Sequence, residues 1–365
     1  MESVKTKKTA FNSIHHILGG KMVEYAGFEM PVQYKGVTYE HETVRSSVGV
    51  FDVSHMGEIS IQGKGSFELL QKLTTNDVSK LYAGKVQYSC MPNDTGGIID
   101  DLLVYQISKN DYLLVVNASN IQKDLDWIKR HNSFGAEIIN ISNSISLLAV
   151  QGPKSLKVLQ KLTDIDLEEL ESYSFTINEL ARIPNALISA TGYTGELGFE
   201  IYVENKYAAH LWEAIFDAGK DEGIEPIGLA ARDTLRLEMG YCLYGNDIND
   251  YTSPLEAGLG WITKFTKNFI YSGFLKIQKE RGVIKKLVAF EIEGKGIPRH
   301  GYEIWDHHHQ IIGTVTSGTL SPTLKKGIGM GYVCFENAKD GSEIFINISN
   351  KPVKGIIVKT PFIKD

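Results

Sequence analysis

The stretch GGIIDDLLVY, residues 96–105, places two neighbouring carboxylates in a segment that otherwise has the composition of a buried strand. A glycine turn followed by Ile, Leu, Val and Tyr favours a β-strand, from which aspartate is normally depleted. Side chains of a strand alternate between its two faces, so Asp101 and Tyr105 share one face while Asp100 lies on the other. The two aspartates are therefore expected to have different roles.

Asn117 is the candidate partner of Asp101 across the hairpin that follows, because it is the first polar residue after the apolar run YLLVV. A connecting loop of three residues would place Asn117 opposite Asp101 on the same face, whereas a loop of two or four residues would break that parity. Alternatively, both aspartates lie near the strand end and are solvated, or cap the turn formed by Gly96 and Gly97. This stretch alone leaves both interpretations open.

Length, composition and charge exclude several classes of protein. A chain of 365 residues is too long for one small core, so two or three domains are expected. No apolar run approaches the roughly 20 residues that would span a bilayer, and the composition is that of a soluble globular protein. The net charge of -6 disfavours a nucleic-acid partner. Residues 1–20 contain no targeting segment, so a cytoplasmic chain is expected.

Short strands and helices succeed one another along most of the chain. Residues 37–54 predict a helix that ends at Gly49, residues 97–107 and 111–117 predict successive strands, and residues 120–132 predict an amphipathic helix. A further helix over residues 228–240 is expected to stop at Gly240, since glycine commonly ends helices. After about residue 271, short strands separated by turn residues predict an all-β barrel or sandwich.

A second candidate site is the glycine-rich segment TGYTGELGFE, residues 191–200. Its glycines permit positive φ and close backbone approach, so the loop could wrap a flat ligand beside the aromatic face of Tyr193. Glu200 stands in the next strand between Phe199 and Ile201, which should point to the opposite face. Its two carboxylate oxygens suit a guanidine-like edge with two parallel donors. The alternative is an ordinary glycine hairpin with a solvent-facing Glu200.

The helix GLAARDTLRLEMG carries Arg232 and Arg236 four residues apart on one face, with Asp233 and Glu238 available for pairing. A salt-bridge lattice within the helix is the default expectation, and such pairs contribute little stability when they are exposed. This pattern by itself predicts no function.

Cysteine and histidine provide no evident metal site. Cys90, Cys242 and Cys334 are an odd number at wide spacing without a Cys-x-x-Cys motif, which favours reduced, structurally silent thiols. The histidines at 307–309 lie between two strand-like segments, so a solvated hairpin tip is expected. Dinucleotide, Walker and hydrolase motifs are absent from the sequence.

Several ordered motifs together resemble the glycine cleavage T-protein family of aminomethyltransferases. They are FDVSHMGEI, GGIIDDLLVY, GYTGELGFE, ARDTLRLEMGYCLYGNDI and SPLEAGLGW, followed by PRHGYEIW and GTVTSGTLSPTL near the C-terminus. The resemblance extends over essentially the whole chain.

The resemblance implies an α+β fold of three domains arranged like a cloverleaf, with two α/β-mixed domains and a C-terminal all-β barrel. The corresponding domains are residues 1–50 with 136–240, residues 51–135 with 241–275, and residues 276–365. It also implies a reaction in which the methylene carbon of an aminomethyl-dihydrolipoyl carrier protein passes to tetrahydrofolate and ammonia is released. Tetrahydrofolate is then a co-substrate, neither metal nor flavin is expected, and a monomer suffices.

Position by position, the resemblance assigns the catalytic role to Asp101, while Asp100 would be structural. Glu200 is assigned to the 2-amino and ring N–H edge of the pterin, and Arg232 either orders that pocket or meets the ligand. The remaining positions that match folate-site residues are Met56, Tyr88, Tyr105, Asn117, Tyr193 and Tyr241. Lys364 is a candidate for the folate tail.

Relatives of this family use the same scaffold for other purposes, which leaves alternatives. A folate-dependent demethylase is the nearest of them, and a non-enzymatic folate-binding protein is another. The Lys-Gly-Cys-x-x-Gly-Gln-Glu signature of the binding proteins is absent from this sequence. We therefore expect the transferase.

Overall fold

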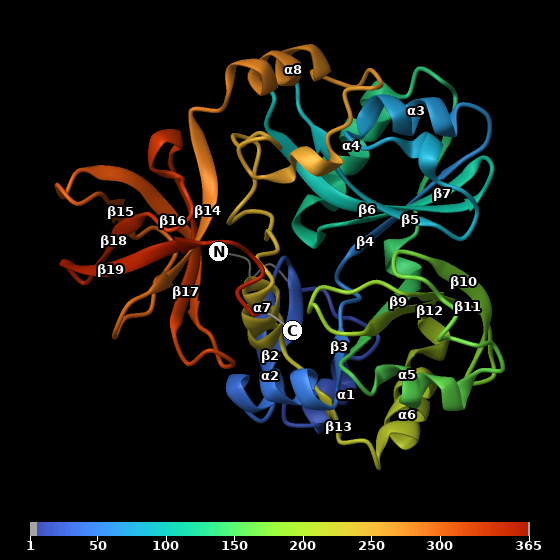
Figure 1. Ribbon diagram of the computed structural model, residues 1–365. Coiled ribbons are helices and arrows are strands. Elements are labelled where there is room, and N and C mark those ends of the chain that lie inside the picture. The colour runs from blue at the N-terminus through green and yellow to red at the C-terminus, as the bar shows by residue number, and fades with distance from the viewer. Residues whose placement is uncertain (1–5, 364–365) are drawn as a thin grey trace, which may run out of the picture. The chain divides into compact units, whose positions relative to one another are not determined.

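The computed structural model describes residues 6–363 (Figure 1). The chain divides into two compact units. The first comprises residues up to Leu69 together with Ser79–Gln87 and Leu103–Asp233, and the second comprises Leu70–Val78, Tyr88–Leu102 and the chain from Thr234 onward. The division of the chain into three domains stays a prediction.

A six-stranded sheet forms the centre of the first unit. Its neighbours are antiparallel except for β3 and β13, which pair in parallel. In spatial order the strands are β10 (Phe175–Leu180), β11 (Ile183–Ser189), β12 (Gly198–Glu204), β9 (Ile145–Gln151), β3 (Val48–Asp52) and β13 (Ile224–Pro226).

The main core of this unit lies on one face of that sheet, where it packs against α1 (Asn12–Ile17), α5 (Ser155–Leu159) and α6 (Ala208–Gly219). Phe199 and Ile201 of β12 point into this core and are almost fully buried. Because side chains alternate along a strand, Glu200 and Tyr202 face the other side of the sheet. The predicted orientation of Glu200 relative to its neighbours is confirmed.

The helix expected to end at Gly49 ends earlier. Helix α2 (Val37–Ser46) is followed at once by β3, and Gly49 lies inside that strand. A Cβ at Gly49 would lie 2.5 Å from side-chain atoms of both Val44 and Ile227. This glycine therefore permits close packing of the strand, so the predicted role as a helix end was wrong. A two-stranded sheet, β1 (Lys21–Tyr25) with β2 (Phe28–Gln33), precedes α2.

The second sheet has five strands in the order β5-β6-β7-β4-β8. The boundary between the two units passes through β5 and β6. Helix α3 (Ser66–Leu73) follows β4 in the sequence, and helix α4 (Ile121–His131) lies between β7 and β8. The strands are β5 (Val86–Pro92), β6 (Ile98–Ser108), β7 (Asp111–Val116), β4 (Gly57–Gln62) and β8 (Glu137–Asn140).

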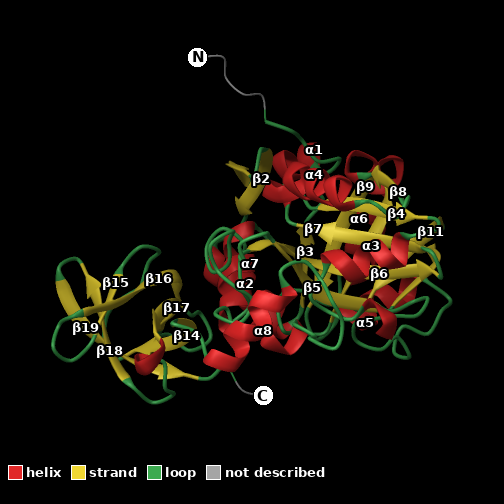
Figure 2. Ribbon diagram, turned by 90° about the horizontal axis from the view of Figure 1, so that it is seen from above, coloured by secondary structure: helices red, strands yellow, loops and turns green. Residues whose placement is uncertain are grey.

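The C-terminal part of the chain forms a closed barrel, drawn in orange to red in Figure 1 and mainly as yellow strands and green loops in Figure 2. The barrel confirms the predicted all-β segment. Helix α7 (Leu229–Glu238) and helix α8 (Ser272–Arg281) precede it in the sequence. Around the barrel the strands are β14 (Lys285–Ile292), β17 (Gly327–Cys334), β16 (Ile311–Leu320), β15 (Glu303–Trp305), β18 (Glu343–Ile348) and β19 (Lys351–Val358).

Gly97, at the start of β6, provides a test of packing in the second unit. A Cβ at this position would lie 1.8 Å from the carbonyl oxygen of Asp250, so Gly97→Ala must displace backbone. We expect it to lower the free energy of unfolding by roughly 1–3 kcal/mol. Gly273→Ala in α8 is the matched control, since no described atom lies within 4 Å of its Cβ position and alanine favours a helix. Urea unfolding of both variants measures the difference, and equal midpoints would contradict the prediction.

Candidate functional site

The two aspartates of β6 lie in different surroundings, as the alternation predicts. Asp100 is fully buried, whereas Asp101 is half-buried. The turn before the strand is closed by Asn93, whose Oδ1 accepts hydrogen bonds of 2.9 Å from the backbone amides of Thr95 and Gly97. The interpretation that both aspartates are solvated is therefore wrong for Asp100.

Tyr88 of β5 donates its phenolic proton to Asp101 Oδ2 at 2.9 Å. Burial raises the pKa of Tyr88 well above its ordinary value, and the negative charge of Asp101 acts in the same direction. The phenol therefore stays protonated and remains a donor at neutral pH. The tyrosine ring also lies 6.1 Å from the ring of Trp261, and both aromatic residues belong to the second unit.

The register of β6 and β7 has the parity that would place Asn117 on the same face as Asp101, although the loop between the strands does not have the expected three residues. Only two residues separate these strands, and a loop of that length taken alone would break the parity. A bulge between Gln106 and Ser108 supplies the extra residue, so Leu103 pairs with Val115 and Tyr105 with Leu113. This is the register that a three-residue loop would give. Asn117 itself follows β7 and precedes a short 3₁₀ helix, η2 (Ala118–Asn120).

Tyr105 lies in the first unit within a group of buried hydroxyls. Its own hydroxyl is 3.0 Å from that of Tyr202, 3.2 Å from Ser189 Oγ and 3.4 Å from Thr191 Oγ1. Tyr105 is fully buried, and its ring packs against those of Phe175 and Tyr202. Burial raises the pKa of Tyr105, so this phenol is also a protonated donor.

Glu200 provides a carboxylate at one end of this cluster of buried hydroxyls. It is only 8% exposed, and its Oε2 accepts the Thr191 hydroxyl at 2.6 Å. Burial raises the pKa of Glu200, while the Thr191 hydrogen bond and the charge of Arg232 both act to lower it. The alternative of a solvent-facing glutamate in an ordinary hairpin is therefore wrong.

The glycine-rich loop closes around a protein side chain that the sequence did not suggest. Gln151 accepts the Thr194 hydroxyl at 2.9 Å and donates to the carbonyl oxygen of Thr191 at 3.2 Å. A Cβ at Gly192 or Gly198 would lie within 2.4 Å of this amide group. These glycines therefore admit Gln151, and the expectation that the loop wraps a flat ligand stays a prediction.

Arg232 and Tyr193 are brought together in the first unit. The guanidinium carbon of Arg232 lies 4.6 Å from the centre of the Tyr193 ring, a cation–π contact. Both side chains are half-buried. Through its charge Arg232 also acts on Glu200, so the three residues form one electrostatic group.

Arg236, the second arginine of α7, has its ionic partner outside the helix. Its Nη1 lies 2.7 Å from Asp247 Oδ2, and both side chains are almost completely buried. Glu238 accepts hydrogen bonds from the hydroxyls of Ser321 and Thr323. The expected salt-bridge lattice within the helix is therefore corrected for these two residues, which are bound to the following loop and to the barrel region.

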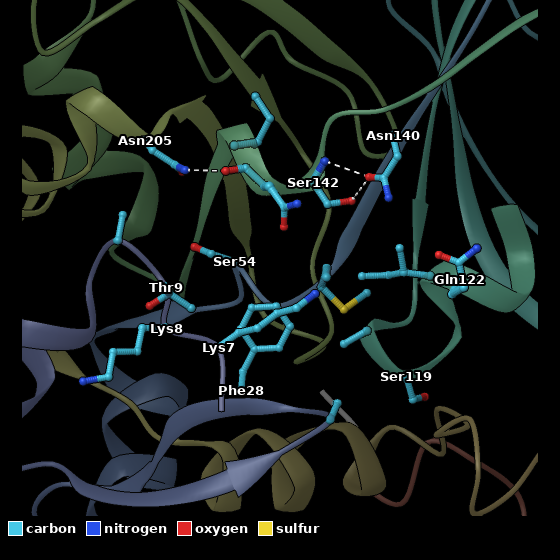
Figure 3. Close-up of a pocket in the computed structure, with 17 residues that line it drawn as sticks. Lys7, Lys8, Thr9, Phe28, Ser54, Ser119, Gln122, Asn140, Ser142 and Asn205 are labelled. Atoms are coloured by element: carbon cyan, nitrogen blue, oxygen red, sulfur yellow. Dashed lines mark hydrogen bonds between the residues drawn. The ribbon is translucent and has the colours of Figure 1, made fainter. Parts of the chain in front are cut away.

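Met56 lines a cavity of about 620 Å³ in the first unit (Figure 3). The walls combine uncharged polar side chains with apolar ones, and Lys7 and Lys8 lie on one side and Gln122 of α4 on another. Ala118 and Ser119, which directly follow Asn117, also belong to the lining.

The candidate residues fall into both units. The second unit contains Tyr88, Asp101 and Tyr241, the last of which is 39% exposed and directly follows the positive-φ Gly240 at the end of α7. The first unit contains Met56, Tyr105, Asn117, Tyr193, Glu200 and Arg232. Lys364 lies outside the described residues.

Sequence reasoning missed Ser189, Thr191 and Tyr202, although a signal was present. Each lies an even number of residues from Glu200 or from one another, and β11 and β12 are neighbours in the sheet. A polar residue at every second position of strands that are otherwise apolar indicates a polar face. Gln151 gave no such signal, because its contacts depend on the path of a loop.

Within residues 6–363, no cluster of three or more His, Cys, Asp or Glu side chains is arranged to bind a metal ion. In the same range no helix has both the length and the apolar character needed to cross a membrane. Cys90, Cys242 and Cys334 form no disulfide, and the histidines at 307–309 are exposed at the β15–β16 hairpin, as predicted.

Comparison with known families places this architecture in a defined class of protein. Residues 11–267 match the GCVT N-terminal domain, and residues 285–364 match the glycine cleavage T-protein C-terminal barrel domain. The chain therefore belongs to the glycine cleavage T-protein family of aminomethyltransferases, as the motifs predicted.

Individual relatives agree over nearly the full length. The chain is 59% identical to an aminomethyltransferase of Flavobacterium psychrophilum, with 98% of this chain and 99% of that one covered. It is 55% identical to an aminomethyltransferase of Bacteroides fragilis, at 98% and 100% coverage. The crystal structure of the glycine cleavage system aminomethyltransferase T from Bartonella henselae superposes with a TM-score of 0.91 at 31% identity, covering 98% of each chain.

Proposed function

We propose that this aminomethyltransferase passes the methylene carbon of an aminomethyl-dihydrolipoyl carrier protein to tetrahydrofolate, with Asp101 as its catalytic carboxylate. The carbon–sulfur bond of the carrier breaks and its electron pair stays on sulfur. Nitrogen leaves as ammonia, and the carbon becomes bonded to two nitrogens of the folate, whose two protons are taken up by sulfur and ammonia.

The observation that carries this proposal is the half-buried Asp101 with its Tyr88 donor. A carboxylate held away from bulk water stabilises the cation that develops as the carbon–sulfur bond breaks. The same carboxylate can orient or deprotonate the attacking nitrogen of the pterin. Tyr88 holds one carboxylate oxygen, Oδ2, so the group meets the substrate in a defined orientation.

In this proposal Glu200 receives the 2-amino and ring N–H edge of the pterin. Support comes from its burial, which excludes water and so strengthens a hydrogen bond to the ligand, and from the charge of Arg232, which favours the carboxylate form. The other residues proposed to line the folate site are Met56, Tyr88, Tyr105, Asn117, Tyr193, Arg232 and Tyr241.

The test of the function is turnover of tetrahydrofolate in the presence of carrier protein loaded with the aminomethyl group. We expect methylenetetrahydrofolate and ammonia to form in equal amounts. Folate binding without release of ammonia from the carrier would overturn the proposed reaction. Demethylation of a sulfonium or ether substrate, measured in parallel, would then identify the demethylase alternative.

Glu200→Ala is expected to weaken tetrahydrofolate binding by about tenfold to a hundredfold, the value of a hydrogen bond to a charged group. Turnover at saturating folate should change less. Glu204→Ala is the matched control, since Glu204 lies on the same strand, is 60% exposed and pairs with Lys206. Titration calorimetry measures both variants. A Glu200 variant that binds as tightly as the control would remove Glu200 from the folate site.

A further inference from the structure

Four buried hydroxyl groups, on Tyr202, Tyr105, Ser189 and Thr191, form a continuous chain that ends on Glu200. Successive oxygens are separated by 3.0 Å from Tyr202 to Tyr105, 3.2 Å from Tyr105 to Ser189, 2.9 Å from Ser189 to Thr191 and 2.6 Å from Thr191 to Glu200 Oε2. None of these residues is more than 8% exposed. This chain of hydroxyls is therefore isolated from bulk water.

A hydroxyl has a single proton to donate, which gives such a chain a direction. The Thr191 hydroxyl is close enough to donate to Glu200 or to Ser189, but it can serve only one of them. An ionised carboxylate can only accept, so Thr191 donates to Glu200. The Tyr105 hydroxyl, 3.2 Å from Ser189 Oγ and 3.4 Å from Thr191 Oγ1, can then donate to either of them, and Tyr202 can donate to Tyr105. If Glu200 takes up a proton, Thr191 can accept from the carboxyl group and donate its own proton to Ser189.

Two ionisable side chains, Arg232 and Glu58, act on opposite ends of this chain of hydroxyls. Arg232 acts on Glu200 from α7 and favours the carboxylate form. Tyr105 and Tyr202 stay protonated because burial raises the pKa of each. Glu58 of β4 acts on Tyr202 from the far end, and burial raises the pKa of Glu58 itself well above its ordinary value. Desolvation thus raises the pKa of Glu200, while the Thr191 hydrogen bond and the charge of Arg232 both favour its carboxylate form.

We propose that Thr191, Ser189, Tyr105 and Tyr202 are positioning residues that keep Glu200 an ionised, acceptor-only group in one orientation for the pterin edge. This inference rests on the proposed role of Glu200 in folate binding. It gives Tyr202, which is 4% exposed, a role that acts through Glu200 without contact with the ligand, and it adds a positioning role to Tyr105. It also predicts a preference for ligands that present donors, because an ionised carboxylate cannot donate in return.

The experiment measures the dissociation constant of tetrahydrofolate, under nitrogen, as a function of pH over the range in which the protein stays folded. Thr191→Val keeps the shape of the side chain and removes the donor, so Glu200 should protonate at higher pH. We expect binding to be weaker than in the wild type at the acid end, by roughly tenfold as for the loss of one hydrogen bond to a charged group, and to recover toward the alkaline end. KM for folate should rise while kcat at saturation is retained.

Three further variants separate the role from a general loss of structure. Thr191→Ser keeps the hydroxyl and should restore the wild-type pH profile. Tyr105→Phe should shift the pH profile less than Thr191→Val does. Tyr202→Phe removes the hydroxyl farthest along the series from Glu200 and should shift the profile least. A profile that does not move in any variant, or an affinity reduced equally at every pH, would overturn the inference. If Glu200→Ala itself binds folate normally, the proposed function of Glu200 has failed instead.

Discussion

Asp101→Asn should reduce turnover by about a hundredfold or more while tetrahydrofolate still binds. Asparagine has nearly the same shape as aspartate and can still accept the Tyr88 hydroxyl, which donates to Asp101 at 2.9 Å. Only the negative charge and the ability to take up a proton are lost. Removing a preorganised electrostatic group from an active site costs about 3–4 kcal/mol of transition-state stabilisation, which corresponds to this loss in rate.

The assay compares ammonia release by wild type and variant at equal folate occupancy, so that a change in binding cannot imitate a change in chemistry. Asp94→Asn makes the same change of charge at an exposed position of the turn before β6 and should leave turnover intact. Retention of more than about a tenth of the wild-type rate by Asp101→Asn would place the catalytic carboxylate elsewhere.

Periodicity was enough to predict much of the fold and part of the candidate site. Alternation along β6 separates Asp100 from Asp101, and alternation along β12 sends Phe199 and Ile201 into the core and Glu200 away from it. Glycine at the end of α7 also behaves as predicted, with a positive φ at Gly240. These features depend on neighbours in sequence, which a single chain reveals.

Features that depend on distant contacts could not be predicted in the same way. The register of β6 and β7 depends on a bulge at Gln106, which loop length does not reveal. Gly49 and Gly192 resemble turn residues in sequence, but each makes room for a side chain from another element. Spacing within α7 suggested partners for Arg236 inside the helix, whereas its buried ionic partner is Asp247.

Breaking that ion pair should cost far more than breaking an exposed ion pair of the second unit. Asp247→Ala would leave the guanidinium of Arg236 buried without its counter-charge, in a side chain only 1% exposed. Breaking a buried pair in this way costs about 3–5 kcal/mol, a large part of the stability of a typical protein. Further hydrogen bonds are lost as well, because Asp247 Oδ2 also accepts the Leu243 amide and the Ser317 hydroxyl, each at 2.9 Å.

Urea unfolding of Asp247→Ala against wild type measures this loss, with Glu343→Ala as the exposed control. Glu343 is 56% exposed and pairs with Lys354 at 2.6 Å, so its removal should cost less than about 1 kcal/mol. Replacing both members, Arg236→Met with Asp247→Leu, should recover much of the stability, because no unpaired charge then remains buried. If Asp247→Ala were as mild as the control, the penalty for burying the arginine charge would have to be met by its other contacts, the Tyr241 carbonyl and the Ser317 hydroxyl.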